Sequence, residues 1–183
     1  ADTSHTFTGL SDGSHTVEVK ARDLAMNEDQ TPASLSFNVD THPPTPVITE
    51  GPGEGTHIAQ TNITFQWTAT DVTSSPDSIY YSYKIDTASY TAWSGDTAAS
   101  YQDLYEGAHT FFLRARDEFD HIGTIQRAFT VDVTPPVTQI TGGPSSGECW
   151  PNSAASFSWS GTDSLAQTSQ LTYSFRMDGD PLS

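Results

Sequence analysis

The sequence has one cysteine and no long apolar run. Because Cys149 is alone, no disulfide can form within the chain, which argues against a small disulfide-stapled module. We expect its thiol to be semi-buried in a loop, with an intermolecular bridge as the alternative. No stretch approaches the ~20 apolar residues of a membrane span. The first ten residues lack the basic and apolar regions of a signal peptide, so we expect any export signal to lie outside this chain.

Basic residues are also scarce. There are 7 Lys and Arg against 23 Asp and Glu, which gives a formal net charge of −16. A phosphate backbone would be repelled, so nucleic-acid binding is excluded as the main function. An acidic surface of this strength can instead collect divalent cations. Hydrophobic residues make up 34% of the chain, which is enough for compact cores, and the wealth of Thr, Ser, Gly and Pro favours short strands and turns.

What the sequence does contain is an internal repeat. The segment FNVDTHPPTPVITEGP begins at Phe37, and its counterpart FTVDVTPPVTQITGGP begins 92 positions later at Phe129. ITFQWTATD and ASFSWSGTD, and YSYKID and YSFRMD, are separated by the same offset, whereas DGSHTVEVKARD and EGAHTFFLRARD lie 94 positions apart. A loop between these blocks can absorb the difference of two residues. The repeat predicts tandem units of about 92–94 residues.

The phase of the repeat predicts three parts. Residues 1–41 correspond to the C-terminal half of a unit (strands E, F and G), and residues 42–133 to a complete unit. Residues 134–183 correspond to the N-terminal half of the next unit (strands A, B and C). Each half alone would expose an apolar sheet face. We therefore expect the halves to be completed by adjacent repeats or by neighbouring copies that associate head to tail.

Alternation of apolar and polar residues predicts the strands of the complete unit. Residues 63–69, 79–85, 109–115 and 127–132 alternate clearly, and shorter strands are expected at 46–49 and 100–104. With turn residues between them and no long helical period, the fold class predicted is all-β, with tandem antiparallel β-sandwich repeats. Trp67, and Trp159 at the equivalent position of the last unit, are expected in the cores.

Three motifs carry a family resemblance. LSDGSHTVEVKARD and LYEGAHTFFLRARD are followed by TPASLSFNVD and by PPVTQITGGP. Together they resemble the immunoglobulin-like, fibronectin type III-related repeats of large bacterial extracellular proteins. The resemblance covers the whole chain and implies a scaffold rather than an activity, because such repeats serve as stalks, adhesive units or spacers. The complete unit has RDEFDHIG (residues 116–123) where the first has RDLAMNED (residues 22–29). The asparagine of the first loop, Asn27, therefore has no counterpart in the complete unit.

Two sets of polar residues are candidate sites. His15 and His109 occupy one position of the repeat, and we expect them to be structural corner residues that hydrogen-bond to loop backbone, with metal ligation or acid–base chemistry as the alternative. Asp40, Asp71 and Asp117 should meet at one end of the complete unit, where they could bind calcium at the repeat junction. The alternative, which we favour, is that they are turn residues that cap their own loops.

Four aromatic residues are predicted on outward faces or in the loop after residue 86: Tyr80, Tyr90, Trp93 and Phe112. They could bind a polysaccharide or a protein, although cross-strand pairing is the favoured interpretation. A binding role predicts that they gather on one face, and a spacer role predicts that they scatter. No nucleophile elbow, phosphate loop or metalloprotease helix occurs, so we expect no enzyme and no obligatory cofactor.

These observations predict a non-catalytic structural segment of an extracellular surface protein or filament. Paired prolines at 43–44 and 135–136 limit bending between units. The partners expected are neighbouring repeats or identical chains. Two alternatives stay open: an adhesive module for polysaccharide or a host protein, and a spacer beside a secreted hydrolase.

Overall fold

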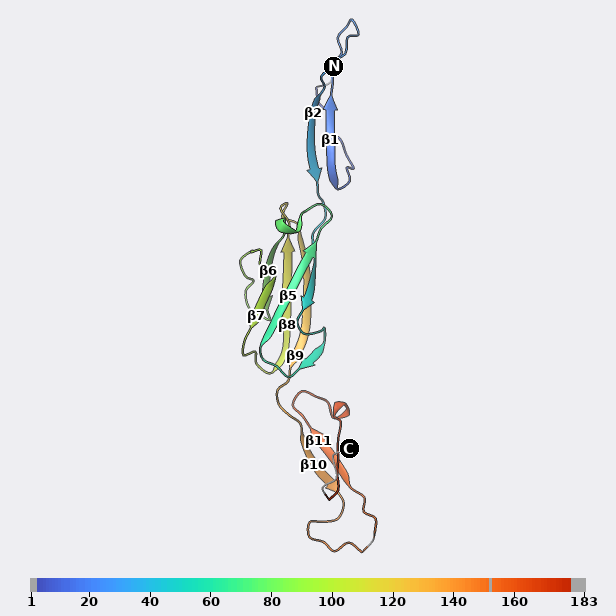
Figure 1. The fold of residues 1–183 in the computed structure, drawn as a ribbon, viewed down its shortest axis with the longest axis vertical. Helices are drawn as coiled ribbons and strands as arrows, with labels where there is room; N and C mark the ends of the chain where they lie inside the picture. Colours follow the sequence, from blue (N-terminus) through green and yellow to red (C-terminus); the bar gives the residue numbers. More distant parts are fainter. Residues whose placement is uncertain (1–2, 152, 179–183) are drawn as a thin grey trace.

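The protein is an elongated array of β-strands. The computed structural model describes residues 3–151 and 153–178, which lie as three successive parts along one axis (Figure 1). The strands are β1 (Gly13–Val19), β2 (Ala33–Val39), β3 (Thr45–Glu50), β4 (Thr56–Ile58), β5 (Ile63–Thr70), β6 (Tyr80–Ile85), β7 (Ala98–Tyr101), β8 (Gly107–Arg116), β9 (Ile122–Val131), β10 (Val137–Gly142) and β11 (Ser158–Thr162). Two short 3₁₀ helices are η1 (Pro76–Ser78) and η2 (Thr168–Gln170). The predicted all-β class is confirmed.

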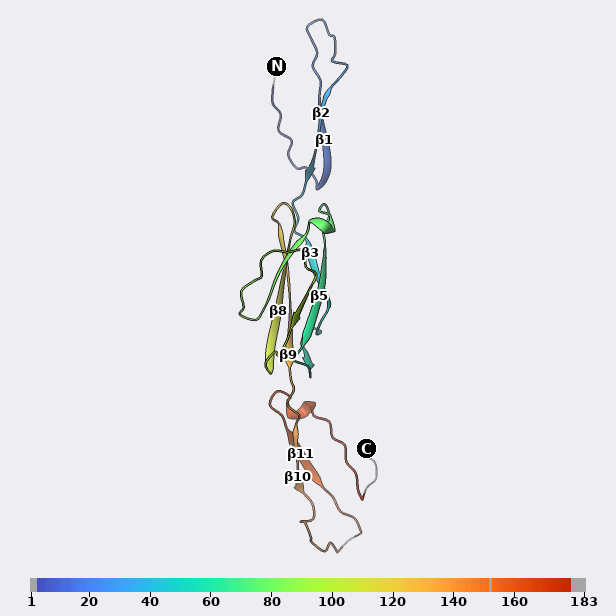
Figure 2. The same ribbon diagram turned by 60° about the vertical axis from the view of Figure 1, so that its left-hand side comes forward.

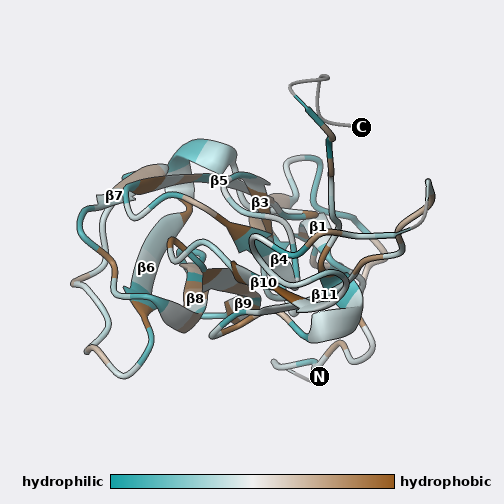
Figure 3. Cartoon of the chain, turned by 90° about the horizontal axis from the view of Figure 1, so that it is seen from below, coloured by the Kyte–Doolittle hydropathy of each residue, from teal (hydrophilic) through white to brown (hydrophobic). Residues whose placement is uncertain are grey.

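The central part is a sandwich of two sheets. One sheet has the order β3-β5-β7 and the other β4-β9-β8-β6, and the view along the axis separates these layers (Figure 3). All pairs are antiparallel except β4 and β9, which run parallel from Thr56↔Phe129 to Ile58↔Val131. The short strand β4 was not predicted. It arises because the chain continues in one direction after β3 and crosses from the first sheet to the second.

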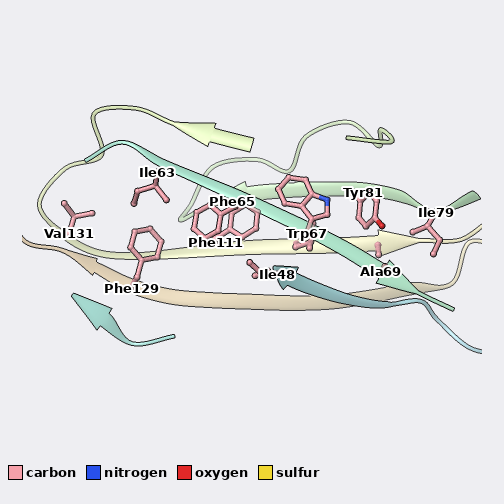
Figure 4. Packing of buried hydrophobic residues seen from close by; sticks show 12 residues of the cluster. Ile48, Ile63, Phe65, Trp67, Ala69, Ile79, Tyr81, Phe111, Phe129 and Val131 are labelled. Carbon is pink, nitrogen blue, oxygen red and sulfur yellow. The ribbon is translucent and has the colours of Figure 1, made fainter. Parts of the chain in front are cut away.

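Aromatic side chains dominate the core between the sheets. Phe65 and Phe111 stack with ring centroids 4.1 Å apart, and Phe129 packs 5.8 Å from Phe65 (Figure 4). Trp67 is 3% exposed, as predicted for the core, and its indole N–H donates to the carbonyl of Asp96 at 3.1 Å. The apolar face of each strand predicted by alternation is therefore the buried face.

The flanking parts repeat the strand pairings of the centre. His15 pairs with Phe37 between β1 and β2, just as His109 pairs with Phe129 between β8 and β9. Ile140 pairs with Trp159 between β10 and β11, as Ile48 pairs with Trp67 between β3 and β5. A β-bulge follows the isoleucine in both of the latter pairs. Equivalent sequences thus adopt the same register in different parts of the molecule.

Unusual backbone conformations recur with the same spacing. Gly51 and Gly143 have φ values of 123° and 136°, and at each a Cβ would lie within 3 Å of a phenylalanine ring, Phe65 or Phe157. Only glycine combines this conformation with so close an approach. Asp86 and Asp178 both have a φ of 50°. Local geometry, as well as register, is therefore common to the equivalent segments.

Two expected strands are not formed in the described residues. Residues 3–12, where strand E of the first part was expected, and 171–178, where strand C of the last part was expected, run apart from their hairpins without strand pairing (Figure 2). The reason is visible in the centre, where β7 pairs with β5 and β6 pairs with β8. The equivalent partners of residues 3–12 and 171–178 are not among the described residues.

Trp159 also lies outside a core, because its partners in a facing sheet are not among the described residues. Its exposed fraction is 38%, and the rings of Tyr173 and Phe175 lie beside it, at 6.3 and 5.4 Å. The prediction that Trp159 is a core residue is wrong, because the facing sheet that covers Trp67 has no counterpart among the described residues of the last part.

Candidate functional site

Asp117 organises the loop at the end of the central sandwich that faces the first hairpin. It follows β8 directly, and its carboxylate is buried. One oxygen accepts the backbone N–H groups of Phe119 and His121 at 2.8 and 2.9 Å, and the other accepts from His121 Nδ1 at 3.0 Å. These bonds close the turn between β8 and β9. Asp117 thus acts first as a loop cap.

Asp40 reaches the same place from the linker between β2 and β3. Its Oδ2 accepts from the Ser74 hydroxyl at 3.2 Å, and its Oδ1 accepts from the backbone N–H of His42 at 3.2 Å. One ligand atom from each of Asp40, Asp117 and His121 lies within 4.8 Å of the others. The predicted convergence at the junction therefore holds for two of the three aspartates.

Asp71 is engaged in its own loop. Its Oδ1 accepts the backbone N–H groups of Thr73 and Ser74 at 2.8 and 2.9 Å, while its buried Oδ2 has no hydrogen-bond partner among the described residues. His121 takes its place in the junction cluster. Sequence reasoning missed His121, although the histidine four residues after Asp117 stands in the segment that departs from the first unit.

The chemistry of this cluster differs from that of a calcium site. Calcium takes six to eight oxygen ligands, whereas imidazole suits zinc and similar transition metals. Asp40, Asp117 and His121 supply two carboxylates and one imidazole, and Asp117 already accepts three hydrogen bonds. The set fits a transition metal better than calcium, and without any metal it already fixes the loop.

A second histidine–aspartate pair ties the first hairpin to the linker. His42 Nδ1 contacts Asp12 Oδ2, and the Thr41 hydroxyl donates to Asp12 Oδ1 at 2.8 Å. The hydrogen bond and charge of Asp12 raise the pKa of His42, and the nearby carboxylates of Asp40 and Asp71 add to this rise. The hydrogen bonds from His42 and Thr41 lower the pKa of Asp12. The linker is thus held to the turn before β1.

The corner histidines lie at the start of β1 and β8. His109 is buried, and its Nε2 donates to the carbonyl of Tyr105 at 2.7 Å. His15 Nε2 makes the same bond to Ser11 at 2.7 Å. His109 also contacts Asp86 Oδ2 through Nδ1 at 2.8 Å, a partner that the sequence did not indicate. A carbonyl oxygen and a carboxylate oxygen therefore hold the ring of His109 from its two nitrogens.

The four candidate aromatic residues gather on one face. Tyr80 and Phe112 lie on the outer face of β6 and β8, where they pair with Arg116 and Lys84. Tyr90 and Trp93 come from the segment after β6. That segment follows the free edge of β6, where the backbone groups of Tyr81 and Ser94 exchange hydrogen bonds of 2.7 and 3.0 Å. The four candidates thus lie over one face, where Tyr80 is exposed and Tyr90, Trp93 and Phe112 are partly buried.

These rings alternate with cations, and together they form what we call the cation–aromatic strip: Lys84, Tyr90, Trp93, Phe112, Arg114 and Arg116. The Lys84 ammonium lies 4.7 Å from the ring centroid of Phe112 and 5.2 Å from that of Tyr90. The Arg114 guanidinium lies 3.6 Å from Tyr90 and 5.0 Å from Trp93, and that of Arg116 lies 4.7 Å from Trp93. Sequence reasoning placed Arg114 and Arg116 on this face without recognising the strip.

Cys149 is exposed, which corrects the prediction of a semi-buried thiol. Within residues 153–178 and the rest of the described chain, the loop between β10 and β11 has no facing sheet to cover it. Among the described residues, no helix is both long enough and apolar enough to cross a membrane.

Comparison with known proteins adds no assignment. No protein-family model matches the chain, and no curated protein matches it. The function therefore has to be argued from the fold and from these clusters.

Proposed function

We propose that the chain is a non-catalytic structural segment of an extracellular surface protein or filament, built from tandem β-sandwich units. The observation that carries the proposal is a correspondence of side chains. Ten large apolar residues exposed at the two ends are equivalents of residues that are buried or partly buried in the centre: Phe7, Leu10, Val19, Phe37, Ile140, Phe157, Trp159, Tyr173, Phe175 and Met177. Together, these residues of the two ends correspond to the core residues of one complete unit.

The resemblance to immunoglobulin-like and fibronectin type III-related repeats supports the same proposal. So does the pairing described above, because equivalent segments keep their register in each part. The half-units are completed by adjacent repeats or by neighbouring copies. In the second case, the C-terminal part of one copy covers β1 and β2 of the next. Such a head-to-tail contact does not close on itself, so it produces a filament.

The junctions support a stiff array. At the first junction Asp40 accepts from Ser74, and at the second Glu106 accepts from Ser164 at 3.1 Å and from Thr134 at 2.6 Å. Paired prolines restrict the backbone of both linkers. Each linker is therefore held by a carboxylate as well as by its own covalent geometry.

Sedimentation of the whole chain over a range of concentrations tests completion by neighbouring copies. The expected average mass rises with concentration, and electron microscopy should show unbranched fibres. Phe37→Lys places a charge at a position of β2 whose equivalent in the centre, Phe129, is buried, and it should suppress association. Asn38→Lys adds the same charge on the opposite face of β2 and should not. A monomer at every concentration would contradict completion in trans and leave completion by adjacent repeats.

One observation favours an adhesive role as a second candidate. The candidates Tyr80, Tyr90, Trp93 and Phe112 lie together with three cations over the outer face of β6 and β8, and Tyr80 among them is exposed.

A further inference from the structure

The outer face of β6 and β8 concentrates the scarce positive charge of the chain. Of its 7 basic residues, three lie here: Lys84, Arg114 and Arg116. In the β6–β8 register these face Phe112, Ser82 and Tyr80, respectively. Residues paired directly across a sheet share a face, so the three cations form a row on one side of the sheet. This acidic protein therefore carries a local positive strip.

The charges of the strip are held by rings rather than by carboxylates. Among the ion pairs of the described residues, Arg116 has one, to Asp120 at 3.0 Å, whereas Lys84 and Arg114 have none. The guanidinium of Arg114 donates to the hydroxyl of Ser82 at 3.0 Å. With 23 acidic residues in the chain, carboxylate partners were plentiful. The rings fix the positions of Lys84 and Arg114 and leave the charges of these two side chains unneutralised.

We propose that the cation–aromatic strip binds an acidic polysaccharide. A uronic acid chain offers both chemistries of the strip at each step, because the C–H face of a sugar packs against a ring and its carboxylate accepts from a guanidinium or ammonium group. The outward positions of β8 recur about every 6.7 Å along the strand, so an extended ligand meets cation after cation. An acidic protein partner would use the same charges, and poly-L-glutamate in the test below distinguishes it from a sugar chain.

The overall negative charge does not prevent this contact. At physiological ionic strength the Debye length is about 8 Å, so a bound chain responds to the strip more than to distant carboxylates. Repulsion from the rest of the protein grows when salt is removed. Binding should therefore be strongest at intermediate salt, and it should fall both at very low salt and at about 1 M salt.

Titration of the full chain with polygalacturonate tests the proposal, with the neutral polymer pullulan as the control ligand. Polygalacturonate should bind and pullulan should not. Arg114→Gln should weaken binding about tenfold, the loss of one charge-assisted contact. Lys84→Gln should weaken it as well, and it remains informative if Arg114→Gln fails to fold. Lys20→Gln removes a positive charge just after β1, far from the strip, and should leave the affinity unchanged.

Three results would overturn the proposal. The first is the absence of polygalacturonate binding by the folded chain. The second is an equal loss of affinity in Lys20→Gln and Lys84→Gln, which would show that only total charge matters. The third is equally tight binding of poly-L-glutamate, which would show that the strip recognises charge without the sugar and fits an acidic protein instead.

Discussion

The central sandwich and the flanking parts place equivalent side chains in opposite surroundings. Phe65 is fully buried, whereas Phe157, at the same position of the next unit, is 40% exposed. Both lie beside a left-handed glycine, and both belong to a segment whose pairing register recurs. The difference arises from the facing sheet, which is present in the centre and missing among the described residues of the flanks. Local sequence specifies the hairpin, and a second sheet is needed to bury it.

The largest effect should come from the two equivalent tryptophans. Trp67→Ala removes the buried centre of the core and should lower the free energy of unfolding by about 3–5 kcal/mol. Trp159→Ala should cost less than about 1 kcal/mol, because the exposed side chain has little burial to lose. Urea unfolding followed by circular dichroism measures both. Equal losses would show that a second copy buries Trp159.

The next largest difference between the centre and the first part should come from the two corner histidines. His109→Gln leaves Asp86 without its partner and should cost about 2 kcal/mol. His15→Gln removes a solvent-exposed hydrogen bond of a partly buried residue and should cost no more than about 0.5 kcal/mol. Thermal unfolding of the two variants gives the difference. A similar loss for both would mean that Asp86 contributes nothing to the corner.

The hairpin–linker pair should respond to pH. The folded-state pKa of His42 is raised, so its contribution to stability is present at low pH and is lost as the pH rises through that raised pKa. The pKa of Asp12 is lowered, so the contribution of its carboxylate is lost when the pH falls through that lowered pKa. The pair is therefore intact between the two values. NMR titration of His42 should show the raised pKa, and Asp12→Asn should remove most of the shift, with the part due to Asp40 and Asp71 remaining.

The smallest effect concerns metals at the junction cluster. Zinc should perturb the NMR signals of His121, whereas calcium should move neither these signals nor the melting temperature. His121→Gln should remove the zinc response, and His57→Gln, a substitution on β4, should retain it. A rise in melting temperature with calcium that disappears in Asp117→Asn would restore the calcium interpretation.

Period-two alternation was sufficient to predict the long central strands β5, β6, β8 and β9 and their buried faces, but it missed β4. It could not predict that residues 3–12 and 171–178 stay unpaired, because a strand forms only when its hydrogen-bonding neighbour is present. Nor did alternation reveal Asp86 as the partner of His109, since the two are 23 residues apart and meet only through the fold. Asp117 and Asp40 were predicted to converge, but His121 was missed because its approach depends on the turn that Asp117 closes.

The parallel pairing of β4 with β9 has a mechanical consequence. The chain enters and leaves the central unit at opposite ends (Figure 1). Tension along the axis therefore pulls β4 and β9 in opposite directions along their length. Three residue pairs, from Thr56↔Phe129 to Ile58↔Val131, are then loaded together in shear instead of opening one after another. A short strand of modest equilibrium stability thus acts as a clamp when the molecule is stretched.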